Sequence, residues 1–135
     1  MSQGNVEVVR RWIRLSNARD FDAIYREILD PAIECYPNEE QAHSAPFESR
    51  DTFIKRARDE RESFEFHQIE VDECIGLDEY VVCVARIHCR GKISGAEVVG
   101  HETWLTRWRD GKCVEYRECR TKERALEAAG LSEDG

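Results

Sequence analysis

The stretch Glu97–Arg120, EVVGHETWLTRWRDGKCVEYRECR, is the most informative part of this chain for its fold. Two runs rich in β-branched and aromatic residues flank Asp110-Gly111, and Asp-Gly between alternating segments is among the strongest short-range signals for a β-hairpin. Strands that mix large rings with a few ionisable groups are typical of the floor of a small-molecule site. This hairpin therefore predicts both a sheet and the place where chemistry would occur.

Alternation along these two strands predicts which side chains share the inner face of the sheet. The residues expected to face inward are Glu102, Trp104, Thr106, Trp108, Val114, Tyr116, Glu118 and Arg120. Because burial raises the pKa of a carboxyl group toward neutral pH, an inward Glu118 is a candidate general base, with Tyr116 beside it. On the same alternation His101 faces away. The alternative is that Glu118 and Arg120 form a structural ion pair, or that Glu102 pairs with Arg120.

The overall charge argues against a nucleic-acid partner. The chain has 135 residues, enough for one substantial core, and we treat residues 1–135 as one domain. Twenty Lys and Arg against 28 Asp and Glu give a net charge of −8, whereas a protein that follows a phosphate backbone needs a basic face. The mixed-sign run Lys55–Glu62 is typical of a solvated helix face.

Hydropathy and cysteine spacing indicate a reduced, cytoplasmic protein that does not bind membranes. No apolar stretch approaches the ~20 residues of a spanning helix, and the N-terminus lacks the pattern of a signal peptide. The six cysteines include no Cys-x-x-Cys pair, so we expect buried structural thiols and no metal site. No glycine-rich phosphate loop or metal-ligand cluster appears, and we expect no cofactor.

Four helices are expected, each behind a residue whose side chain can cap it: Asn5, Asp20, Ser49 and Thr121. The first ends before the short link at residues 17–19. Pro31 stops the second helix, because the residue before a proline is pushed out of helical geometry. The third runs to about Arg61, and Gly130 ends the last one as its left-handed terminal residue.

The remaining segments predict strands, with a polar loop over residues 38–48 that contains His43. A short strand covers Ala32–Tyr36, and further strands start at Phe64 and at Glu79, ahead of the hairpin. Early helices followed by a long meander predict an α+β domain. We expect a curved antiparallel sheet wrapped around the N-terminal helices to form a cone.

Several segments in this order carry a family resemblance: Val6–Asp22, Leu29–Pro31 with Ile33-Glu34 beyond, Ser49–Phe53 and Trp108–Cys113. They resemble the nuclear transport factor two-like superfamily, especially its polyketide-cyclase-like and ketosteroid-isomerase-like branches. The resemblance covers nearly the whole chain and implies a cystatin-like roll. It is specific for fold and weak for activity, because this superfamily hosts isomerases, cyclases, dehydratases, epoxide hydrolases and binding domains.

The resemblance argues against steroid isomerase activity. The tyrosine of that family's first helix falls on Trp12, its general-base aspartate near Tyr36, and its second acidic group on Trp104. Neither tryptophan offers a comparable acidic proton, and tyrosine is a poor base near neutral pH. We therefore reject that specific activity.

The cyclase-like branch fits better at the last strand. Its members often carry a pattern such as Glu-His-Trp-Asp, which Val114–Glu118 resembles, with Glu118 at the acid position and Tyr116 at the histidine position. A second acid/base histidine belongs on a neighbouring strand, where His88 or His101 could supply it.

Two hypotheses follow. The first is a small-molecule-binding domain of the polyketide-cyclase-like type, acting as a cofactor-free isomerase, cyclase or hydrolase on a hydrophobic substrate. In it Glu118 is the base, and Tyr36 or Tyr116 donates a hydrogen bond. The second is a non-catalytic ligand-binding or dimeric assembly module, so whether the protein is an enzyme stays open. Besides these groups, the residues expected to line the cavity are Trp12, Phe53, Glu102, Trp104, Trp108 and Arg120. The resemblance also implies a homodimer formed through the outer face of the sheet.

Overall fold

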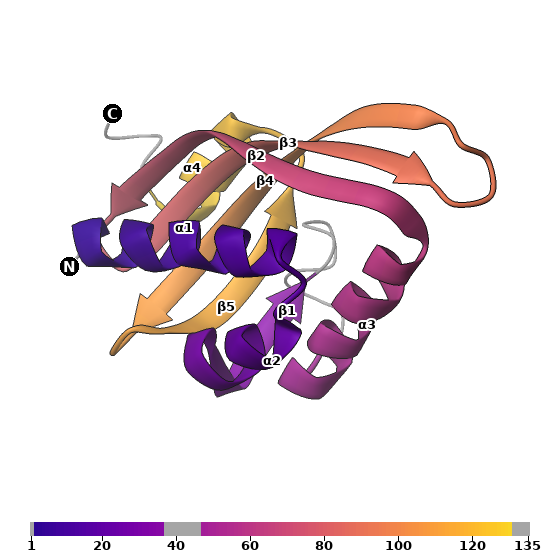
Figure 1. Cartoon of the computed structure of the whole chain (residues 1–135). Coiled ribbons are helices and arrows are strands. Elements are labelled where there is room, and N and C mark those ends of the chain that lie inside the picture. The colour runs from indigo at the N-terminus through magenta and orange to yellow at the C-terminus, as the bar shows by residue number, and fades with distance from the viewer. Residues whose placement is uncertain (1, 37–46, 131–135) are drawn as a thin grey trace.

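The computed structural model describes residues 2–36 and 47–130 and shows an α+β fold, in which helices cover a curved, open sheet of five strands (Figure 1). The strands are β1 (Leu29–Tyr36), β2 (Phe64–Leu77), β3 (Tyr80–Gly91), β4 (Glu97–Arg109) and β5 (Lys112–Cys119). Their order across the sheet is β1-β5-β4-β3-β2. The expected fold class is confirmed. Strands β2 to β5 form the antiparallel meander, whereas β1 joins β5 in parallel, a pairing that the sequence patterns did not indicate.

The predicted hairpin turn connects β4 and β5. Asp110 and Gly111 both have positive φ, 53° and 79°, which is the backbone of a two-residue turn of type I′. Glycine adopts this conformation without strain, and aspartate tolerates it better than most residues. The register that follows places Trp104 opposite Glu118 and Thr106 opposite Tyr116.

A β-bulge lies next to this turn. Arg107 pairs with Glu115 and Trp108 with Cys113, so Val114 is an extra residue on β5. Cys113 is fully buried in the main core as a result, and Val114 is only partly buried. The expectation that Val114 shares the inner face with Tyr116 is therefore wrong, because the bulge breaks the two-residue alternation.

Three helices start behind the capping residues that the sequence indicates. These are α2 (Phe21–Ala23) after Asp20, α3 (Arg50–Glu62) after Ser49 and α4 (Lys122–Ala128) after Thr121, and each cap accepts a backbone N–H at 3.1–3.2 Å. Gly130, with φ 81°, follows α4 as expected. The start predicted for the first helix is wrong, because α1 spans Ser2–Asn17 and Asn5 lies inside its first turns.

The second helix ends before Pro31 is reached. After α2 the chain makes one turn of π-helix, η1 (Ile24–Ile28), and β1 already begins at Leu29, three residues before the predicted Ala32. Pro31 can lie within β1 because this strand is at the edge of the sheet, where a missing N–H costs no ladder hydrogen bond. The pairing of β1 with β5 is irregular over this stretch.

Helices lie on both faces of the sheet. α1 crosses the inner face, with α2 and α3 beside it, and α4 covers part of the outer face (Figure 1). The main core lies under the first three helices and includes Ile24, Ile28 and Leu29, each at most 1% exposed. A smaller core under α4 contains Val82, Leu105 and Ala125.

All six cysteines are free thiols, and Cys35, Cys83 and Cys113 are buried. Within residues 2–36 and 47–130, no helix has the length and apolar character needed to cross a bilayer. Most of the predicted polar loop, including His43, lies outside the described residues.

Candidate functional site

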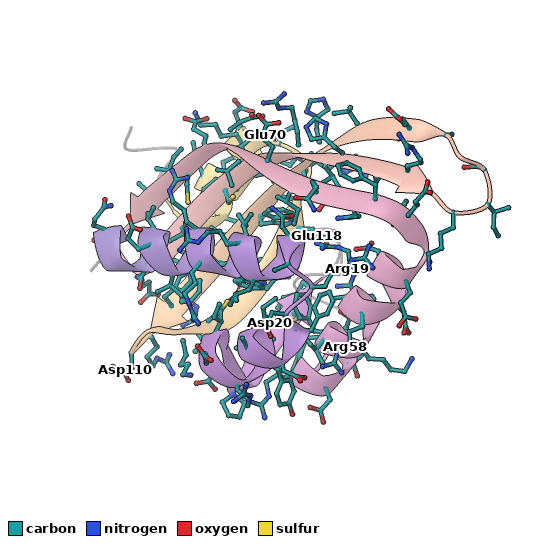
Figure 2. All side chains as sticks on the ribbon, viewed as in Figure 1. Arg19, Asp20, Arg58, Glu70, Asp110 and Glu118 are labelled. Carbon is teal, nitrogen blue, oxygen red and sulfur yellow. The ribbon has the colours of Figure 1, made fainter. Side chains whose placement is uncertain are left out.

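A cavity of about 180 Å³ lies between the inner face of the sheet and the helices. α1 and α3 supply Trp12 and Phe53, and the strands supply Glu102, Trp104, Tyr116 and Glu118. Figure 2 shows Glu118 near the C-terminal end of α1, on the helix-covered side of the sheet. Six of the nine residues expected at the site therefore meet around one cavity.

The Glu118 carboxyl group is the most perturbed acid of the cavity. Burial and the neighbouring Glu102 raise the pKa of Glu118 to about 7, against the lowering effect of a hydrogen bond from Tyr116. That bond joins the Tyr116 hydroxyl to Glu118 Oε2 at 3.0 Å. Burial also raises the pKa of the Tyr116 phenol, so this group remains a donor at neutral pH. Glu118 can thus gain or lose a proton close to neutral pH.

Glu102 is the second carboxyl group of the cavity. It lies diagonally across the β4–β5 ladder from Glu118, because Trp104 occupies the position directly opposite Glu118. The indole N–H of Trp104 donates to Glu102 Oε1 at 2.9 Å. Burial raises the pKa of Glu102 from its ordinary value, although this hydrogen bond acts in the other direction. Two acids in one enclosed space favour a state in which one is ionised and the other protonated.

An aromatic cluster closes one side of the cavity. Trp12 contacts Phe53 at 6.2 Å between ring centroids, Trp108 at 6.2 Å and Tyr116 at 5.9 Å. Rings tilted or edge-on at such distances attract one another and fix the position of Tyr116.

Trp108 was predicted to line the cavity, but it belongs to the core. It is 4% exposed, and its indole N–H donates to Thr106 Oγ1 at 2.8 Å. Trp108 faces inward as alternation requires and packs against Trp12, which lines the cavity, whereas Trp108 itself is not among the lining residues.

Tyr36 and Arg120 also lie outside the cavity. On β1, Cys35 faces the core, so Tyr36 points to the opposite side, where its hydroxyl donates to Glu34 Oε1 at 3.0 Å. Arg120 follows the last residue of β5 and is exposed, because strand alternation ends at Cys119. Arg117, opposite Tyr36 in the sheet, forms an ion pair with Glu115 on that same outer side.

The two histidines that could have assisted Glu118 are on the outer face. His88 Nε2 lies 2.9 Å from Glu70 Oε1, and His101 is exposed opposite Arg86. His67 on β2 lines the cavity instead, and it is 8% exposed. Alternation could have identified it, because His67 shares a strand face with Ile69 and Val71, which pack on the main core.

Two arginines of α3 were also missed, since the run Lys55–Glu62 has the composition of a solvated face. Arg56 lines the cavity and its Nε donates to both oxygens of Glu48 at 3.1 Å. Arg61 lines it as well and is 5% exposed. The mixed charges of residues 55–62 therefore did not indicate that one side of α3 faces the cavity.

No group of three His, Cys, Asp or Glu side chains is placed to hold a metal ion within the described parts of the chain. What the cavity does contain is two carboxyl groups with raised pKa values, each bonded to a neutral donor, and an apolar wall. Such a set can move a proton to or from a bound organic molecule.

Similar folds occur among solved structures of low sequence identity. AclR from Streptomyces galilaeus, assigned as a hydroxylase, superposes with a TM-score of 0.77 at 18% identity, over 96% of this chain and 98% of AclR. A protein from Jannaschia sp. CCS1, assigned as a SnoaL-like polyketide cyclase, gives 0.75 at 23% identity over 97% and 93%. A hypothetical protein of ketosteroid-isomerase-like fold from Catenulispora acidiphila, in complex with trimethylamine, gives 0.70 at 14% over 96% of each chain.

The sequence itself identifies the family. No curated protein matches this chain. Residues 9–116, however, match the family profile of the SnoaL-like domain, and this range runs from α1 to the middle of β5. The resemblance to the polyketide-cyclase-like branch of the nuclear transport factor two-like superfamily is thereby confirmed: the chain belongs to the SnoaL-like domain family.

Proposed function

We propose that this protein is a cofactor-free acid/base enzyme that transfers a proton on a small hydrophobic carbonyl compound, as an isomerase, cyclase or hydrolase. Glu118 is the base and Tyr116 holds it in position. The observation that carries the proposal is a carboxyl group whose pKa is raised to about 7 at the wall of a partly apolar cavity. A general base is most effective when its pKa lies near the working pH.

The two carboxyl groups would have different tasks. Ionised Glu118 removes a proton from the carbon next to a carbonyl group, and the electron pair left behind moves onto the carbonyl oxygen. Glu118 then returns this proton to the product, and the Tyr116 phenol is a neutral donor available to the oxygen. Glu102, together with burial, raises the pKa of Glu118 and so makes it a stronger base.

The size of the cavity favours a small ring system. Its volume of about 180 Å³ is close to the ~150 Å³ of an engineered cavity that binds benzene. A substrate with one ring, or one ring of a larger substrate, would fill it against Trp12 and Phe53. The apolar lining supports a hydrophobic molecule as the ligand.

The test is exchange of carbon-bound protons in deuterated water, followed by NMR for a panel of cyclic ketones such as 2-tetralone and cyclohexanone. We expect the wild-type protein to accelerate exchange and Glu118→Gln to lose at least about 100-fold of that acceleration. Glu70→Gln, which changes a carboxylate on the outer face of the sheet, is the matched control and should keep full activity. Equal rates for Glu118→Gln and wild type would refute the role of Glu118.

A non-catalytic binding module is the second candidate, and one observation favours it. Tyr116 and Trp104 already hydrogen-bond the two carboxyl groups, as they would in a purely structural network. In that case cyclic ketones would bind without any acceleration of proton exchange, in wild type and variant alike.

We also propose that the protein is a cytoplasmic homodimer. The free thiols are in keeping with a reducing compartment. For the dimer, partly exposed apolar side chains near the β3–β4 turn, among them Val99 and Phe66, support an interface on the sheet. Sedimentation that shows only monomer at high protein concentration would refute it.

A further inference from the structure

Arg61 is a buried cation whose charge is not balanced by an ion pair. The guanidinium is 5% exposed and lines the cavity. Within residues 2–36 and 47–130, the guanidinium donates to the backbone oxygen of Ser16 at 2.6 Å and to the Ser16 hydroxyl at 2.5 Å, and it lies 6.0 Å from the centre of the Phe21 ring. None of these partners is a carboxylate. A buried charge is costly unless an opposite charge or several hydrogen bonds stabilise it.

A structural role explains part of this arrangement. Ser16 is in the last turn of α1, where a nearby cation is favourable, and its carbonyl oxygen also accepts from the backbone N–H of Arg19 at 3.0 Å. Arg61 therefore fastens the end of α1 to α3. That role uses two of the five N–H donors of a guanidinium, and the other three remain for a further partner.

His67 lies beside this group with an unsatisfied nitrogen. The side chain is 8% exposed, lines the same cavity, and its Nδ1 is buried with no hydrogen-bond partner. Burial and the charge of Arg61 lower the pKa of His67 to about 4, so the ring is neutral at pH 7 and carries one N–H donor. Buried polar atoms without a partner are rare, and one in a residue that lines a cavity is available to a bound molecule.

We propose that Arg61 and His67 form a subsite for the carboxylate group of a ring compound that enters the cavity. A planar carboxylate matches the fork of a guanidinium and would balance its charge, and the Nδ1–H tautomer of His67 would donate to the same group. The substrate class is then an aromatic or cyclic carboxylate, held at Arg61 while its carbon acid meets Glu118. This inference rests on the proposal that the cavity takes a small ring compound.

The charges around the subsite allow an anion to enter. Glu60 and Glu102 act on Arg61 through space, and both line the cavity. In the described part of the chain, neither carboxyl group is hydrogen-bonded to the Arg61 guanidinium, and burial raises the pKa of Glu102 from its ordinary value. Arg56, a second cation of the lining, is already paired with Glu48. Arg61 is therefore the group of the lining best suited to receive a carboxylate.

The test compares benzoate with benzamide, which has nearly the same shape but no charge, by titration calorimetry on the full chain at pH 7. We expect benzoate to bind at least about tenfold more tightly, since a hydrogen bond to a charged group contributes that much. Arg61→Gln should reduce the preference below about threefold, and Arg61→Lys, which keeps the charge but not the planar fork, should keep only part of it. Arg58→Gln is the matched control, because Arg58 is on the same helix but pairs with Asp22 at 2.5 Å outside the cavity (Figure 2).

Benzamide also serves as a control for structural damage, because such damage would lower the affinity for both ligands equally. If Arg61→Gln does not fold, His67→Phe replaces it: phenylalanine keeps the contact with Phe64 at 5.3 Å but removes the nitrogen, and the preference should fall about twofold to threefold. Equal affinity of the wild type for the two probes, binding of neither, or an unchanged preference in Arg61→Gln would overturn the subsite. The exchange assay uses neutral ketones, so it judges the role of Glu118 separately.

Discussion

The inner and outer faces of the sheet both carry acidic residues, but they place them in opposite surroundings. On the outer face Glu70 contacts both Arg86 and His88, and Asp72 contacts Arg86 as well (Figure 2, where Glu70 lies on the side of the sheet away from α1 and α3). On the inner face Glu102 and Glu118 accept hydrogen bonds from an indole and a phenol. Solvent and cations surround the outer acids, whereas burial raises the pKa values of Glu102 and Glu118 on the inner face.

The number of charged residues on a face therefore does not show where the functional site of this chain lies. The outer acids and bases neutralise one another in a half-exposed network, which contributes little to stability and has no evident task. The charged groups of the inner face are only partly balanced by opposite charges. The observations that support proton transfer and ligand binding come from this face.

The largest change in stability is expected when a ring is removed from the packed inner face. Trp12→Ala removes the ring that contacts Phe53, Trp108 and Tyr116, and should lower the free energy of unfolding by about 3 kcal/mol. His101→Ala, at an exposed residue on the outer face, should change it by less than about 0.5 kcal/mol. Urea unfolding followed by tryptophan fluorescence and circular dichroism measures both, and similar losses would mean that the two faces are packed alike.

A medium effect is expected from the charge of Glu118, and it depends on pH. The folded pKa of about 7 exceeds the ordinary 4.5, so between these values the folded protein binds the proton more strongly and its stability falls as pH rises. Below about pH 4 the carboxyl group is protonated in both states and costs nothing. Glu118→Gln should thus be more stable than wild type by about 2 kcal/mol above pH 8, after allowance for residual exposure.

Thermal and urea unfolding at pH 4, 6 and 8 would measure that difference. The gain of Glu118→Gln should shrink steadily as pH falls and vanish near pH 4. A constant gain at all three values would show that the pKa of Glu118 is ordinary, and would weaken its assignment as the base.

The smallest effect belongs to the outer network. Arg86→Gln removes the partner of Glu70 and Asp72, yet the thermal midpoint should move by only about 2 °C or less, since exposed ion pairs are screened by water and salt. The remaining shift should fall further in 0.5 M sodium chloride. A large, salt-independent loss would mean that the outer face is as desolvated as the inner one.

Much of the fold follows from local signals. Asp110-Gly111 predicted the turn, and Asp20, Ser49 and Thr121 predicted helix starts, because each depends on a bond within a few residues. The parallel pairing of β1 with β5 did not follow, since it joins segments that have no local pattern in common.

The candidate site was only partly predictable for the same reason. Alternation placed Glu102, Trp104, Tyr116 and Glu118 together, because all four lie on one ladder. It failed at Arg120, where β5 has ended, and it could not place Arg61, whose orientation depends on how α3 crosses the sheet. Helix packing is a tertiary property that the charge pattern of residues 55–62 does not encode.

The pairing of β1 with β5 has a consequence for how the chain is made. Cys35 meets Tyr116 across about 80 residues of intervening sequence, so the edge of the sheet cannot form until most of the protein has left the ribosome. Until then β1 has no partner strand, only the isolated bridge between Cys35 and Glu48, and the fully buried Leu29 and Ile33 remain uncovered by β5. Contacts between such distant segments slow folding, and this protein should therefore depend on chaperones during synthesis more than a helical domain of equal length.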